Sequence, residues 1–118
     1  MVPNEVDALP PAIDLEFGGN CQNRKTPEDV RRDVLLLAAA LERGTGKKPV
    51  LYVTGQAFWT FVERGEVPLP LWFRDVWAEP KHPTWLFWQF ANREQIDGIN
   101  GPVDVNVFRG DEAAWRQW

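Results

Sequence analysis

Two acidic residues, Asp14 and Glu16, lie two positions apart in residues 12–17, a short stretch that alternates apolar and acidic side chains. In a β-strand this spacing points both carboxyl groups to the same side, with Cα atoms about 7 Å apart. Two carboxyls held that close need not ionise together, so one can donate a proton while the other stays charged. Hydrolysis of a glycosidic bond uses that division of roles. The alternative is a pair of solvated acids on an edge strand.

A second polar pair with the same spacing, Asp104 and Asn106, lies in residues 103–107. Valines occupy the intervening positions, so the pattern predicts another strand with one polar and one apolar face. A polar face on a late strand can simply contact solvent, and that alternative stays open. If both strands belong to a barrel, the two polar pairs converge at one mouth.

Aromatic side chains are unusually frequent, with seven Trp, seven Phe and one Tyr in 118 residues. Such rings fill hydrophobic cores, and they also stack on sugars. Trp72 and the segment 85–90, in which Gln89 adds a hydrogen-bonding amide, are candidates for a stacking groove. Strand alternation divides this segment between two faces, with Trp85, Phe87 and Gln89 on one and Trp88 and Phe90 on the other.

The composition is that of one folded domain, residues 1–118, with a net charge of −4 that argues against a nucleic-acid partner. The lone Cys21 has no partner for an intramolecular disulfide or a zinc site. Residues 1–11 lack the basic start and apolar core of a signal peptide. The longest apolar run, residues 34–41, is far shorter than the roughly 20 residues of a membrane helix, so we expect no membrane span.

The order of elements predicts an α/β fold. Thr26, Pro27 and an acidic first turn form a typical helix start, and Gly44 or Gly46 supplies the stop. The flanking segments 12–17 and 49–54 are strand-like, and their alternation with the helix favours a mostly parallel sheet. The predicted core stripe of this helix is Val30, Val34, Leu37, Ala38 and Leu41. The other predicted elements are a helix at 56–63 closed by Gly65, strands at 71–73, 85–89 and 103–107, and a terminal helix at 111–118 capped by Asp111.

About five strands fit part of a β/α barrel better than a doubly wound sheet, because the connections 73–85 and 89–103 read as loops. A complete eight-stranded barrel takes about 250 residues. We therefore expect a partial barrel, with the other strands absent or supplied by another chain.

Five short segments match a known pattern in order and spacing. They are LPPAIDLE at 9–16, KPVLY at 48–52, PLW at 70–72, WLFWQ at 85–89 and GINGPVDVN at 98–106. Together they resemble glycoside hydrolase family 25, which includes the Chalaropsis-type lysozymes and many phage endolysins. The resemblance runs from about residue 2 to the C-terminus. It implies a β/α barrel that hydrolyses the β-1,4 bond between N-acetylmuramic acid and N-acetylglucosamine in peptidoglycan, and so an extracytoplasmic site of action.

The resemblance also implies roles for individual residues. Glu16 matches the general acid that protonates the leaving oxygen, and Asp14 matches the carboxylate that positions the substrate's own acetamido group as it closes on the anomeric carbon. Asp104 matches an acid that lines the same pocket, and no cofactor is implied. The positions that match the family's groove are Tyr52, Trp72 and Gln89.

The front of the sequence departs from the family. Members begin with a strand that carries an isoleucine-aspartate signature, followed by two more strands before the Asp-x-Glu strand, whereas Met1 falls just ahead of that strand. About three strands and one active-site Asp therefore have no counterpart. We expect an open sheet edge at residues 12–17, covered in a homodimer or by the rest of a longer protein.

Three hypotheses remain open at this stage. The first is a muramidase, and the second is a non-catalytic peptidoglycan-binding remnant that keeps the aromatic groove. The third is a hydrolase in which Asp14, Glu16 and Asp104 hold magnesium, since carboxylates suit that ion. Dependence of the activity on magnesium favours the third.

Overall fold

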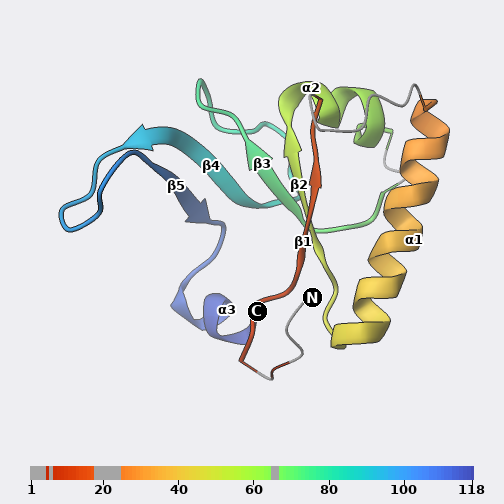
Figure 1. Cartoon of the computed structure of the whole chain (residues 1–118), viewed down its shortest axis with the longest axis horizontal. Helices are drawn as coiled ribbons and strands as arrows, with labels where there is room; N and C mark the ends of the chain where they lie inside the picture. The colour runs from red at the N-terminus through yellow and green to blue at the C-terminus, as the bar shows by residue number, and fades with distance from the viewer. Residues whose placement is uncertain (1–4, 6, 18–24, 65–66) are drawn as a thin grey trace.

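The described strands form a single five-stranded sheet, in which neighbours in sequence are also neighbours in space. Their bounds are β1 (Ala12–Leu15), β2 (Val50–Thr54), β3 (Leu71–Arg74), β4 (Trp85–Glu94) and β5 (Val103–Phe108). The first four strands are parallel and β5 returns antiparallel to β4 (Figure 1). The predicted α/β fold with a mostly parallel sheet is therefore confirmed. The described part of the sheet is not closed, because β1 and β5 each have a neighbour on one side only.

This computed structural model describes residues 5, 7–17, 25–64 and 67–118. The predicted turn at Gly18 and Gly19, the unpaired Cys21 and the helix stop at Gly65 lie outside these residues. In the part of the chain that is described, no helix is both long and apolar enough to cross a membrane.

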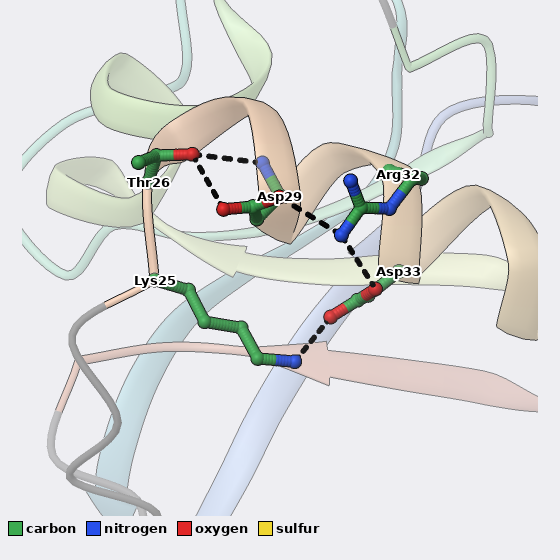
Figure 2. Close-up of polar contacts among 5 residues, drawn as sticks. All are labelled: Lys25, Thr26, Asp29, Arg32 and Asp33. Carbon is green, nitrogen blue, oxygen red and sulfur yellow. Dashed lines mark hydrogen bonds and ion pairs between the residues drawn. The ribbon is translucent and has the colours of Figure 1, made fainter.

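Helix α1 (Pro27–Thr45) begins and ends at the predicted signals. The Thr26 hydroxyl accepts a hydrogen bond from the Asp29 backbone N–H at 3.1 Å, which satisfies one of the free donors of the first turn. Figure 2 shows the surrounding polar contacts, in which Arg32 lies 2.8 Å from the Asp29 carboxylate and Lys25 pairs with Asp33. Gly46, with a φ of 70°, ends the helix in the left-handed conformation that glycine adopts without strain.

One face of the sheet packs against α1 (Figure 1). Val34 and Ala38 are buried there with Ile13, Leu51 and Val53. The expectation that Leu37 joins this core is wrong, because its side chain is 48% exposed. Leu37 instead lines a pocket between α1 and β1, at the edge where the described sheet stops.

The remaining helices lie at opposite ends of the sheet (Figure 1). The predicted helix at 56–63 is a short α2 (Gly55–Ala57) that continues as the π-helix η1 (Phe58–Val62). The predicted terminal helix is α3 (Glu112–Gln117), and the Asp111 carboxylate caps it by accepting from the Ala114 N–H at 2.9 Å. Because α2 follows β2 directly, it marks the carboxyl end of the parallel strands.

An irregularity at the start of β4 changes which faces its aromatic rings occupy. The register shifts between Leu71 and Trp72 of β3, so that Trp85 pairs with Leu71 while Phe87 pairs with Trp72. Trp85 therefore lies in the helix-covered core with Trp88, and not on the face of Phe87 and Gln89 as strict alternation predicts.

Candidate active site

The sheet face opposite α1, here called the inner face, carries two rows of paired residues that run across the strands. The first row crosses all five strands and is mostly aromatic: Asp14, Tyr52, Trp72, Phe87 and Phe108. The second row lies nearer the carboxyl ends of the parallel strands and is polar: Thr54, Arg74, Gln89 and Asn106. Glu16 follows just past the end of β1, two residues after Asp14. Most of the residues predicted from the sequence therefore share one face and one end of the sheet.

Two hydrogen bonds join the rows, and each passes over an intervening strand. The Tyr52 hydroxyl on β2 donates to Gln89 Oε1 on β4 at 2.8 Å. The Trp72 Nε1–H on β3 donates to Asn106 Oδ1 on β5 at 2.7 Å. Strands lie about 4.8 Å apart, so contacts between side chains two strands apart fit a sheet that curves toward its inner face. Tyr52 and Trp72 also pack edge to face, with ring centroids 5.4 Å apart.

Burial and charged side chains from several strands affect the pKa of the Tyr52 hydroxyl. Burial raises the pKa of its hydroxyl, the nearby Arg74 guanidinium opposes that rise, and the carboxylates of Glu16, Asp14 and Asp104 add to it. Acids from the first and the last strand thus act on the same phenol. The predicted convergence of the two polar pairs is consistent with this arrangement.

The predicted site residues differ in accessibility. Asp14, Glu16 and Asp104 are exposed, and Tyr52 and Trp72 are half-buried. Gln89 is only 3% exposed and its amide oxygen accepts from Tyr52, so it offers little surface to a ligand. Among the described residues no three His, Cys, Asp or Glu side chains gather closely enough to hold a metal ion.

Arg74 is the inner-face residue that the sequence reasoning missed. It is the last residue of β3 and pairs with Thr54 and Gln89 in the polar row. The alternation of residues 71–74 contains the signal, because it places Arg74 on the same side as Trp72.

At the amino ends of the parallel strands, next to the aromatic row, the inner face has an apolar pocket of about 240 Å³ near α3. Phe87 and Trp118 pack there with ring centroids 4.8 Å apart, and Trp115 adds a third ring. The residues that line the pocket are Leu9, Pro10, Ala12, Val50, Trp72, Phe87, Asn106, Trp115 and Trp118. The inner face is thus polar at the carboxyl ends of the parallel strands and apolar at their amino ends, which is the distribution expected of a β/α barrel interior with its site at one mouth.

Comparison with known proteins identifies the family. The family model for glycosyl hydrolases family 25 matches residues 2–99. The chain belongs to this family. The family 25 resemblance that the five sequence segments carry is confirmed.

The family 25 relatives are longer than this chain. A family 25 glycosyl hydrolase from Bacillus anthracis is 35% identical and superimposes with a TM-score of 0.87, over 99% of this chain and 57% of that one. The uncharacterized protein YegX of Escherichia coli K12 is 34% identical over 105 residues, which are 86% of this chain and 37% of YegX. A bacterial lysozyme from Streptomyces coelicolor, 24% identical, shares the fold with a TM-score of 0.69 over 87% of this chain and 51% of that one. The chain spans about two fifths of the curated relative and just over half of the solved ones.

Proposed function

We propose that this chain carries the catalytic residues of a peptidoglycan hydrolase of the lysozyme type, which cleaves the β-1,4 bond between N-acetylmuramic acid and N-acetylglucosamine. The observation that supports the proposal most directly is the grouping of Asp14, Glu16 and Asp104 around Tyr52 on the inner face of a family 25 chain. The carboxyl ends of parallel strands are where β/α folds bind their substrates. The site of action is extracytoplasmic, because peptidoglycan lies there.

The proposed reaction proceeds by substrate-assisted retention. The carbonyl oxygen of the substrate's acetamido group attacks the anomeric carbon, while the glycosidic bond breaks and Glu16 gives its proton to the leaving oxygen. Asp14, which lies in β1 two residues before Glu16, orients the acetamido group and stabilises the positive charge that develops on it. Water then attacks the anomeric carbon, the bond between that carbon and the acetamido oxygen breaks, and the water gives a proton to the Glu16 carboxylate. The acetamido group is restored and the sugar leaves with its original configuration.

The surrounding residues position the substrate. Trp72 is half-buried on the inner face and is fixed by its bond to Asn106, so its ring is held ready for stacking on a sugar. Tyr52 is fixed in the same way by Gln89. A site held by such bonds loses little conformational entropy when the glycan binds.

Release of reducing ends from purified peptidoglycan tests the proposal. We expect Glu16→Gln to lower the rate at least about 100-fold, because removal of a general acid typically costs that much or more. Asp14→Asn is expected to lower the rate without weakening glycan binding to the same degree. Glu112→Gln is the matched control, because Glu112 is an exposed acid on α3 that pairs with the exposed Arg116.

The same assay separates the alternatives. Equal activity of the wild type and Glu16→Gln would contradict the proposed role of Glu16. If both are inert while both bind glycan strands, the chain is the non-catalytic binding module. That alternative is favoured by one observation: the edge of β1 beside the acids is not covered by any other strand that the structure describes.

A further inference from the structure

We propose that Arg74 is a specificity residue that binds a carboxylate on the glycan and so selects anionic, muramyl-containing strands over neutral ones. The inference rests on the proposed function, since it assigns Arg74 to the substrate of the same site.

The position of Arg74 supports this role. It ends β3, the middle strand of the sheet, and points to the inner face at the carboxyl ends of the parallel strands. Its two neighbours in the polar row are already engaged, because Thr54 caps α2 and Gln89 accepts from Tyr52. Arg74 is therefore the member of this row with the greatest capacity to bind a ligand.

The charge of Arg74 is available to a ligand. The side chain is half-buried, and among the described residues no carboxylate lies within 4.0 Å of its guanidinium. A partly desolvated guanidinium gains strongly from an anion, and its planar fork of donors matches the two oxygens of a carboxylate.

The arrangement of charges across the inner face fixes where an anion can bind. Asp14 lies on β1 and Asp104 on β5, the two edges of the described sheet, whereas Arg74 lies on the central strand. The acids repel an anion at either edge, and the Arg74 guanidinium between them attracts one. This arrangement favours one register for a glycan that carries a carboxylate.

The chemistry of the substrate supplies such an anion. The muramyl sugar carries a lactyl carboxyl group and N-acetylglucosamine does not. In glycan strands stripped of peptide this carboxyl is free and ionised. In intact peptidoglycan it is joined to a peptide stem, whose own carboxylates then carry the charge. The shared recognition element is a carboxylate attached through the lactyl arm.

Calorimetric binding of defined glycan strands tests the inference. The ligands are strands stripped of peptide, strands that keep their stems, and stripped strands whose carboxyls are converted to neutral methylamides. We expect Arg74→Gln to weaken binding of at least one charged ligand about 10- to 100-fold and to leave the neutral ligand unaffected. If Arg74→Gln weakens the binding of stripped strands alone, the group that Arg74 binds is the lactyl carboxylate. If it weakens the binding of stem-bearing strands alone, that group is a carboxylate of the peptide stem.

Two further variants sharpen the test. Arg74→Lys keeps the charge without the fork and is expected to retain part of the selectivity, which also covers the case in which Arg74→Gln does not fold. Arg43→Gln is the matched control, because Arg43 is an exposed arginine in the last turn of α1, at the opposite end of the sheet.

An equal loss on charged and neutral strands, or no loss on any, would overturn the inference. The calorimetric test measures binding and not cleavage, so its result does not depend on whether the chain is catalytically active. Charge-selective binding by an inert chain would overturn the proposed activity and support the role of Arg74.

Discussion

Tyr52 links the aromatic and polar rows of the inner face through one hydrogen bond. Tyr52→Phe removes the donor and leaves the nearly buried Gln89 Oε1 without that partner, so we expect a loss of about 1–3 kcal/mol in the free energy of unfolding. Urea unfolding at neutral pH measures it. Tyr52→Phe combined with Gln89→Leu removes both partners and is expected to recover part of the loss, whereas an additive further loss would contradict the assignment.

The same tyrosine makes stability depend on pH in the alkaline range. Burial raises the pKa of Tyr52 above the ordinary tyrosine value of 10.0, so the folded chain holds this proton more tightly than the unfolded chain. The contribution is complete below about pH 10 and is lost as the pH rises through the folded pKa. Tyr52→Phe lacks this term, so the difference in unfolding free energy between the two proteins should narrow in strong alkali. A constant difference would show that Tyr52 titrates normally.

The positions of the candidate site residues were partly predictable at this scale. Asp14, Glu16 and Asp104 stand out because strand alternation places each of them on a polar face between apolar neighbours. The signal for Arg74 is weaker: alternation places it on the side of Trp72, but a lone arginine after three apolar residues is equally compatible with an exposed strand end. Its importance depends on the register of three strands, which a linear pattern does not contain.

Among the elements, the stability of α1 depends on the hydrogen bond that caps its first turn. Thr26→Ala removes the oxygen that accepts from the Asp29 N–H, and we expect a loss of about 1 kcal/mol in unfolding free energy. Thermal unfolding followed by circular dichroism measures the change. Thr26→Ser keeps the oxygen and serves as the control, so an equal loss in both variants would assign the effect to the threonine methyl group instead.

The helix and strand positions were predictable because their signals are local: caps, prolines, glycines and periodicity. Two features of the packing could not be predicted from the sequence. The register shift between Leu71 and Trp72 places the Trp85 side chain in the core, and no residue pattern in 85–90 indicates this shift. The exposure of Leu37 reflects the absence of a described neighbour beside β1, and periodicity reports only that a residue is apolar.

At the scale of the whole molecule, one edge of β1 has no neighbour among the described strands. A pocket of about 360 Å³ runs beside it, lined by Ile13, Val30, Val34 and Leu37 with Asp14, Lys25 and Asp33 at its rim. A strand edge without a neighbour presents unpaired backbone N–H and C=O groups, and such an edge favours association. We propose that a second copy of the chain covers this edge.

Light scattering over a range of protein concentrations tests that proposal. We expect a mass that rises toward that of a dimer, and Leu37→Glu should abolish the rise by placing a charge in the pocket. Leu36→Glu is the matched control, because Leu36 is 63% exposed on α1 and lines a different pocket, away from β1. A monomer at all concentrations, with cooperative unfolding, would contradict the dimer.

The tryptophans of the inner face have a spectroscopic consequence. Trp115 and Trp118 lie 5.7 Å apart beside α3, close enough for their electronic transitions to couple. Trp72 lies in the first row, bonded to Asn106, where a bound sugar would alter its emission. Because the chain has seven Trp, the difference from Trp72→Phe assigns the emission change to Trp72, and the difference from Trp115→Phe assigns the dichroism of the coupled pair.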